Sequence, residues 1–174
     1  RGLGDVYKRQ SFRILPEGDG FLLAMTRELL EPQLADLKKY AVFSKARLTD
    51  ESAAWVRFGV DHGTAALAAL GLDVPQQPGA TVRRDGLIAI NVSADRVELW
   101  APAAQADAVR EQLAAHLPQG ELDDWLLGQI RAGIGQVMEQ TRELFIPQMI
   151  NLQAVGGVSF KKGCYTCLLY TSDA

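Results

Sequence analysis

The order of apolar and polar residues along the chain predicts a mixture of strands and helices. Apolar side chains alternate with polar ones over residues 11–15, a turn-forming sequence occupies residues 16–20, and residues 21–25 are almost continuously apolar. This pattern predicts a β-hairpin in which the second strand is the more buried. Residues 30–41 then carry leucines at helical spacing, which predicts an amphipathic helix.

The central part of the chain predicts a sheet accompanied by helices. Residues 54–60 alternate as a strand should, and an alanine-rich helix is expected before Gly71. The Asp-Gly pair at residues 85–86 is a strong hairpin signal between two further strands. A strand at residues 96–100 and a helix beginning at Pro102 complete the order strand, helix, strand, strand, strand, helix. The fold class is therefore α+β, with antiparallel sheet and an order that resembles a ferredoxin-like plait.

Four more local expectations follow from the pattern. A short strand is expected at residues 46–48, and Asp61 is expected to cap the helix that follows it. A helix is expected at residues 121–134, and a short one at Pro147. The expected core face of the first of these two helices consists of Leu122, Trp125, Leu126 and Ile130.

Both ends of the chain resemble translated transposon-type sequencing adapters. Such segments are excluded from fold reasoning, so we interpret residues 11–166 as the natural segment. We divide the chain into an adapter-like, non-native segment at residues 1–10, the end of a truncated N-terminal α+β subdomain at 11–52, a plait-like α+β subdomain at 53–118, a segment with a helix, a linker and a cysteine motif at 119–166, and a second adapter-like segment at 167–174.

This interpretation changes the candidate chemistry of the cysteines. Cys164 and Cys167 have the C-x-x-C spacing of a redox or metal motif, but the second cysteine belongs to the adapter-like segment. The motif is therefore rejected, and no metal site is expected. Lys161 and Lys162 favour the thiolate form of the remaining cysteine, and Gly163 lets the chain present it at a surface. The alternative is a small, buried, structural cysteine.

Composition excludes some classes of function. The net charge of −3, from 18 basic and 21 acidic residues, argues against binding nucleic acid through overall charge. A local basic patch is left open, but the sequence gives no argument for direct nucleic-acid binding. No apolar run approaches the ~20 residues that span a bilayer, so no membrane association is expected. Neither histidine lies in a motif, and no serine has the context of a nucleophile elbow.

Trp125 is the other candidate for a binding residue. An indole at the start of an amphipathic helix is commonly a core residue. It is also a flat surface on which a heterocycle such as a pterin stacks. The sequence leaves both readings open.

Two separated motifs resemble the YgfZ family. They are EPQL followed by LKKYAVFSK near residues 31–45, and IPQMINLQAVGGVSFKKGCYT at residues 146–166. The family signature is K-G-C-Y-x-G-Q-E, whose first five positions match Lys162, Gly163, Cys164, Tyr165 and Thr166. The Gly-Gln-Glu that completes the signature is absent, and the departure falls where the adapter-like segment begins.

The resemblance implies a fold related to the glycine-cleavage T-protein, with plait-like domains around a folate site and a C-terminal β-barrel that this chain lacks. It implies binding of tetrahydrofolate or a one-carbon derivative, with Trp125 as a folate-binding residue. It also implies a role in tRNA modification and in maintaining iron–sulfur enzymes such as tRNA methylthiotransferases, in the cytoplasm. Cys164 would be the key residue, assisted by Lys162.

The resemblance leaves the enzymatic status of the chain open. An accessory folate-binding protein is the main interpretation, rather than a defined enzyme. The alternatives are a folate-dependent aminomethyltransferase, for which no poised carboxylate can be assigned, and an interaction scaffold in which Cys164 is buried.

Overall fold

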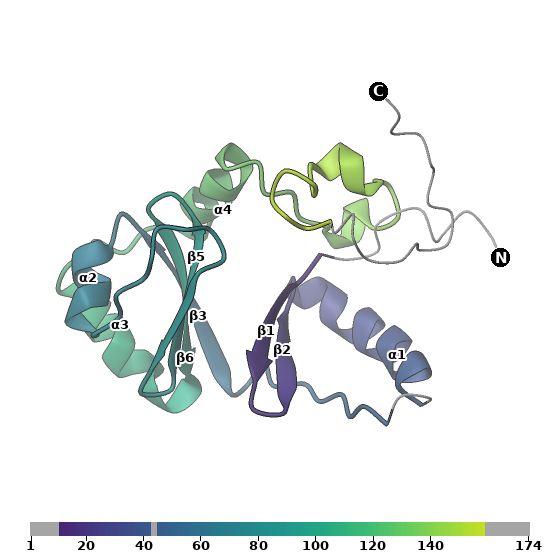
Figure 1. The fold of residues 1–174 in the computed structure, drawn as a ribbon, viewed down its shortest axis with the longest axis horizontal. Helices are drawn as coiled ribbons and strands as arrows, with labels where there is room; N and C mark the ends of the chain where they lie inside the picture. The colour runs from purple at the N-terminus through teal and green to yellow at the C-terminus, as the bar shows by residue number, and fades with distance from the viewer. Residues whose placement is uncertain (1–10, 43–44, 159–174) are drawn as a thin grey trace. The chain divides into compact units, whose positions relative to one another are not determined.

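The computed structural model describes residues 11–42 and 45–158 and has two compact units (Figure 1). One unit comprises Arg1–Leu48 and Gln129–Ala174, and the other comprises Thr49–Gly128. We call them the split unit and the central unit, and each is described by itself. Both contain antiparallel strands and helices, so the α+β fold class is confirmed.

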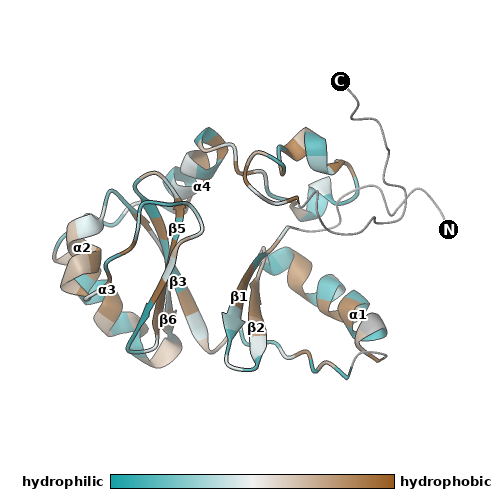
Figure 2. Ribbon diagram, viewed as in Figure 1, coloured by the Kyte–Doolittle hydropathy of each residue, from teal (hydrophilic) through white to brown (hydrophobic). Residues whose placement is uncertain are grey.

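The split unit begins with the expected hairpin and helix. Strands β1 (Arg13–Glu17) and β2 (Gly20–Ala24) pair as a two-stranded antiparallel sheet. Helix α1 (Leu30–Ala41) follows a 3-10 turn, η2 (Arg27–Leu29), and presents polar and apolar residues in alternate bands (Figure 2). The expectation that β2 is the more buried strand is wrong, because Leu15 of β1 is buried whereas Phe21 of β2 is exposed. A continuous apolar run is buried only where other elements cover both faces of its strand, and in β2 three of the five residues are exposed.

Polar contacts join the second segment of the split unit to the first. The backbone N–H of Val137 donates to Ser11 Oγ at 3.0 Å, and the N–H of Glu139 donates to Glu28 Oε1 at 2.7 Å. Val137 itself is buried. These contacts fix the chain around the 3-10 turn η4 (Glu139–Thr141). The helix expected at Pro147 is a short 3-10 turn, η5 (Pro147–Ile150), which ends where Asn151 adopts φ +57°.

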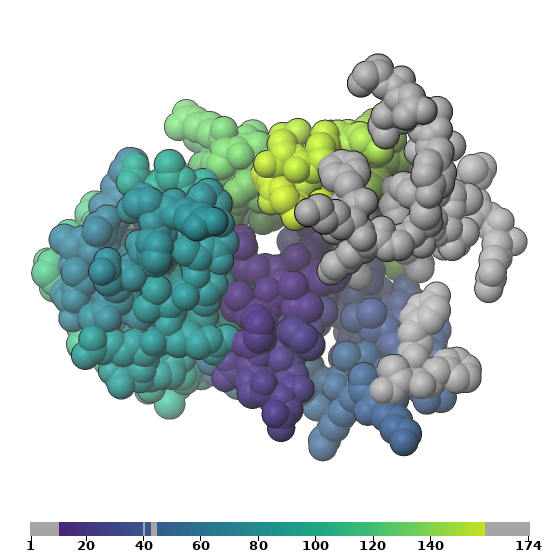
Figure 3. All heavy atoms as spheres, viewed as in Figure 1, coloured from purple at the N-terminus to yellow at the C-terminus, as the bar shows by residue number. Residues whose placement is uncertain are grey.

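The central unit is a four-stranded sheet with two helices on one face. The sheet order is β3-β6-β5-β4, every pairing is antiparallel, and β4, β5 and β6 form a meander. The atoms of this unit are coloured from blue through teal to green by residue number in Figure 3. The chain order is strand, helix, strand, strand, strand, helix, as expected. The elements are β3 (Trp55–Asp61), α2 (Thr64–Ala69), β4 (Thr81–Arg84), β5 (Leu87–Ser93), β6 (Arg96–Pro102), η3 (Ala103–Gln105) and α3 (Ala106–Ala114).

One sheet face, which we call the helix-covered face, carries the aliphatic core of the central unit. Leu67 of α2 and Val109 and Leu113 of α3 pack with side chains from the strands. Leu99 of β6, at the centre of the sheet, is 0% exposed. The strand residues of this core are Phe58 and Val60 of β3, Val82 of β4, Leu87 and Ala89 of β5, and Val97, Leu99 and Ala101 of β6.

The hairpin turn in this sheet has the geometry that the sequence predicts. Asp85 has φ +50° and Gly86 has φ +83°, so both central residues of the turn lie in the left-handed region. A two-residue turn of this kind matches the right-handed twist of the strands it joins. It sets the register in which Arg84 pairs with Leu87.

Three further local expectations are wrong. Residues 46–48 form no strand. Asp61 is the last residue of β3 rather than a helix cap, because the turn continues to Gly63 and α2 begins without a side-chain cap. Helix α4 (Leu122–Arg131) exists, but its expected core face is not buried: Leu122 is 68% exposed and Ile130 is 72% exposed. The buried residue of α4 is Gln129, which the apolar pattern cannot indicate.

Candidate functional site

The residues expected to carry the chemistry divide into one that the structure describes and four that it does not. Lys162, Gly163, Cys164 and Tyr165 lie outside the described residues. Trp125 lies on α4, within the central unit, and is half-buried. The site is therefore built outward from this indole.

The second face of the central sheet carries the residues around Trp125, and we call it the tryptophan face. Residues paired in an antiparallel register project to the same side of a sheet, and successive residues alternate. Because Val60 pairs with Val97 in the aliphatic core, the positions between core residues on these two strands share the opposite face. They are Trp55, Arg57, Gly59 and Asp61 of β3, and Arg96, Glu98 and Trp100 of β6.

Aromatic and charged side chains contact one another along this face. The rings of Trp55 and Trp100 meet edge to face, with centroids 6.4 Å apart and an interplanar angle of 66°. Arg57 lies over the Trp100 ring at 5.9 Å and donates from Nη1 to Glu98 Oε1 at 3.2 Å. Since Trp125 also packs on this face, all 3 tryptophans of the chain gather there.

Trp125 rests directly on the backbone of Gly59 in β3. A Cβ atom at residue 59 would fall 2.4 Å from Cδ2 and Cε3 of the indole and 2.9 Å from Cε2. No real side chain makes contacts this short, so only glycine lets the ring approach the strand so closely. The glycine is the reason that a large aromatic side chain fits here between a helix and a sheet.

Arg96 makes the second contact to Trp125. Its Cζ lies 3.9 Å from the centroid of the indole ring, within the range of a cation–π interaction. Its Nη2 donates to the backbone carbonyl of Trp125 at 2.6 Å. Arg96 therefore contacts both the ring and the helix backbone of the same residue.

The guanidinium of Arg96 is buried, and only 6% of the residue is exposed. The oxygen Oδ2 of Asp61 lies 3.8 Å from its Nε. Burial lowers the pKa of Arg96, and the negative charge of Asp61 opposes that shift. Nε and Nη1 have no hydrogen-bond partner among the described residues. A desolvated cation with unmade hydrogen bonds interacts more strongly with an aromatic ring than an exposed one does.

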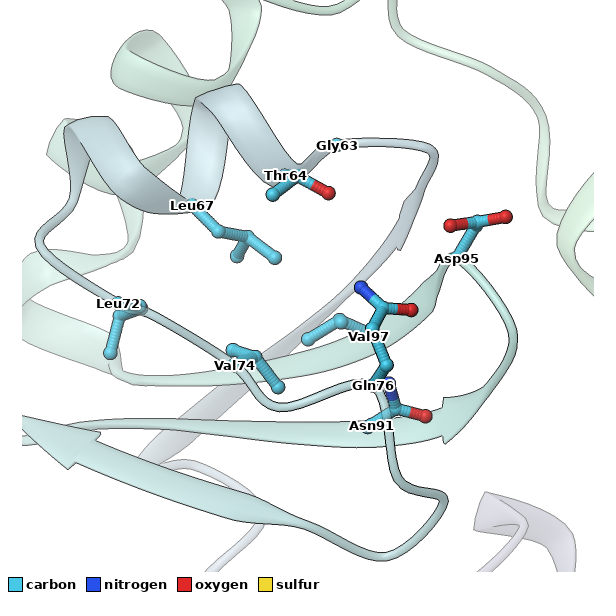
Figure 4. Close-up of a pocket in the computed structure, with 9 residues that line it drawn as sticks. All are labelled: Gly63, Thr64, Leu67, Leu72, Val74, Gln76, Asn91, Asp95 and Val97. Atoms are coloured by element: carbon cyan, nitrogen blue, oxygen red, sulfur yellow. The ribbon is translucent and has the colours of Figure 1, made fainter.

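A small pocket lies on the other side of the sheet, at the edge of the aliphatic core (Figure 4). Leu67, Leu72 and Val74 line one end, and polar side chains, including Asn91 and Asp95, gather at the other. It offers about 20 Å³ of solvent space, room for one water molecule. Asn91 donates to the Pro75 carbonyl at 3.1 Å, while its Oδ1 has no partner within the described residues. None of the residues expected to bind a ligand lines this pocket.

Two kinds of site are absent from the part of the chain that the structure describes. Residues 11–42 and 45–158 hold no group of three or more His, Cys, Asp or Glu side chains able to bind a metal ion. No helix among these residues has the length and apolar content needed to cross a bilayer.

The sequence is similar to curated bacterial proteins named tRNA-modifying protein YgfZ. It is 36% identical over 159 residues to the one from Shigella dysenteriae serotype 1, and 35% identical over the same length to those from Escherichia coli O157:H7 and Escherichia coli K12. Each alignment covers 90% of this chain and 49% of the relative. This chain belongs to the YgfZ family. It spans about half the length of the YgfZ proteins it matches. No family model matches the chain.

In this YgfZ-family chain the sequence singles out Trp125 as a candidate but not the two residues that contact it, Arg96 and Gly59. Arg96 was identified only as the first residue of a strand, and the positions between the core residues of β3 look like solvent-facing ones. The signal that could have found them is Gly59 itself, since a glycine in the middle of a strand indicates a close approach by another group.

Proposed function

We propose that this chain is the folate-binding part of an accessory protein for tRNA modification. The observation that carries the proposal is the similarity, over 90% of the chain, to proteins named for tRNA modification. The proposal has two further parts, which rest on the family resemblance. They are the binding of a tetrahydrofolate derivative and the support of iron–sulfur enzymes such as tRNA methylthiotransferases.

The tryptophan face has the chemistry that a folate needs. A folate joins a flat, partly polar heterocycle to a negatively charged glutamate tail, and it supplies a one-carbon unit when bound. Trp125 and Trp55 offer half-buried indoles at this face, and the buried Trp100 supports the Trp55 ring edge to face. Arg57, whose side chain is 44% exposed, provides a cation at the same face. Aromatic surface beside a cation suits such a ligand.

Because Gly59 and Arg96 already pack on the Trp125 indole, a ligand would meet the remaining exposed part of that ring. Trp125 would then orient the heterocycle by its ring, while the neighbouring aromatic side chains exclude water from it. If Trp125 has this role, the affinity for the folate should fall when the indole is removed.

The folate step is tested by titrating the chain with 5-formyltetrahydrofolate. We expect Trp125→Ala to weaken binding by about tenfold, the equivalent of about 1.4 kcal/mol, since aromatic pairs contribute about that much beyond burial. Leu127→Ala is the matched control, because Leu127 lies on the same helix and is exposed. Equal affinity for the wild-type chain and the Trp125 variant would contradict the proposal.

The thiol step concerns Cys164. We propose that its thiolate, favoured by Lys162, acts in the redox-sensitive maintenance of the partner enzyme. The test is complementation by the full-length protein in cells that lack it, with thiolated tRNA measured by mass spectrometry. Cys164→Ala is expected to lower tRNA thiolation, whereas Thr166→Ala, at the variable position of the motif, is not. Full thiolation with the cysteine variant would reject the role of the thiol.

A further inference from the structure

Arg96 makes two contacts with Trp125 and is buried. The guanidinium lies over the ring at 3.9 Å, it donates to the carbonyl of the same residue at 2.6 Å, and only 6% of Arg96 is exposed. Surface arginines ordinarily keep the guanidinium in water. The buried guanidinium of Arg96 has instead exchanged contacts with water for contacts with Trp125.

Two glycines make room for this arrangement. Gly59 lies against the indole, as described above. Gly128, one helical turn after Trp125 on α4, lies against the guanidinium: a Cβ there would fall 2.6 Å from Cζ and Nη2 of Arg96. Side-chain atoms at either position would push the ring or the cation out of place. Gly59 on strand β3 therefore makes room for the ring, and Gly128 on helix α4 makes room for the guanidinium.

Asp61 supplies the compensating charge. It pairs with Arg96 in the β3–β6 register, and its Oδ2 lies 3.8 Å from Nε. That distance is too long for a direct hydrogen bond, and the Asp61 side chain is 53% exposed. The carboxylate therefore steadies the charge of Arg96 without drawing the guanidinium away from the indole.

We infer that Arg96 is a positioning residue that fixes the orientation of the Trp125 indole for ligand binding. The inference rests on the folate binding proposed above only for the identity of that ligand. Arginine suits the role because its planar guanidinium stacks on a ring and donates at the same time. Lysine keeps the charge but lacks the planar stack, so it is expected to hold the ring less well.

A first measurement reads the indole without any ligand. The chain labelled with 5-fluorotryptophan has 3 fluorine positions, and the one lost in Trp125→Phe is that of Trp125. In Arg96→Met this resonance is expected to move and broaden, while those of Trp55 and Trp100 stay in place. Arg110→Met is the matched control, because Arg110 lies over the Phe58 ring at 5.9 Å with an exposed side chain. An unchanged Trp125 resonance in folded Arg96→Met would overturn the inference.

A second measurement reads the consequence for binding. Arg96→Met is expected to weaken binding of 5-formyltetrahydrofolate about tenfold, and Arg96→Lys by less, with far-UV circular dichroism like that of the wild type. If Arg96→Met does not fold, the folded Arg96→Lys chain decides both measurements. Wild-type affinity in the folded Arg96 variants overturns the inference. A wild-type chain that binds no folate overturns the proposed function instead, and the fluorine spectra then decide whether Arg96 orients the indole.

Discussion

The two faces of the central sheet differ in what their side chains do. On the helix-covered face, aliphatic residues such as Leu99 and Ala89 pack against α2 and α3 and are 0% exposed. On the tryptophan face, Trp55 and Trp100 meet edge to face, Arg57 pairs with Glu98, and Arg96 stacks on Trp125. Strands β3 and β6 contribute residues to both faces.

If the proposed function holds, one face serves mainly stability and the other mainly ligand recognition. Aliphatic packing is non-directional and scales with buried area, so the helix-covered face stabilises the fold without selecting a ligand. Edge-to-face rings, a stacked guanidinium and an ion pair each require a particular geometry. We therefore expect substitutions on the first face to change the free energy of unfolding, and those on the second to change ligand binding more than stability.

The largest expected effect is at Leu99. Leu99→Ala removes buried methyl groups at the centre of the helix-covered face and leaves a cavity, so the free energy of unfolding is expected to fall by about 3 kcal/mol. Urea unfolding of the purified chain measures this change. Leu99→Met, which nearly conserves volume, is the control and should cost less than about 1.5 kcal/mol. Equal effects of the two substitutions would show that this face is not closely packed.

The helix-covered face is also the part of the central unit that the sequence predicts well. Alternation over β3 identifies Phe58 and Val60 as core residues, and Asp85-Gly86 fixes the hairpin, because both signals are local. The tryptophan face depends on contacts between residues far apart in the chain. Arg96 meets Trp125 only because α4 returns to the sheet, and no pattern of apolar residues encodes that return.

The same reason explains the errors at Asp61 and on α4. Asp61 precedes a helix in the sequence, as a capping residue would, but it completes β3 in register with Arg96 instead. The apolar stripe of α4 predicts burial of Ile130, yet Gln129 is the buried residue. Local propensity is overridden where tertiary contacts decide. Trp125 is a candidate because of its residue type together with the family resemblance, and both of these can be read from the sequence.

The next effect in size is at Gly59, the position of the tryptophan face at which an added side-chain atom is expected to change stability as well as the site, because it would strike the Trp125 ring. Gly59→Ala places a Cβ 2.4 Å from the Trp125 ring, so the ring must move and the strand must distort. We expect a loss of about 1–3 kcal/mol in the free energy of unfolding, typical of overpacking, together with a displaced Trp125 fluorine resonance. Gly20→Ala is the control, because the nearest atom to its Cβ would be 3.8 Å away. A stable Gly59→Ala chain with an unmoved resonance would contradict the close packing of the indole on β3.

The smallest expected effect tests the ion pair between Arg57 and Glu98. Their side chains are 44% and 12% exposed, so solvent screens the 3.2 Å contact between them. A double-mutant cycle with Arg57→Met and Glu98→Gln is expected to give a coupling energy in unfolding below about 1 kcal/mol. A much larger coupling would mean that the charged residues of the tryptophan face hold the sheet together as the aliphatic residues do. A small one would mean that Arg57, the more exposed of the two, can exchange its contact with Glu98 for one with a ligand at little cost to the fold.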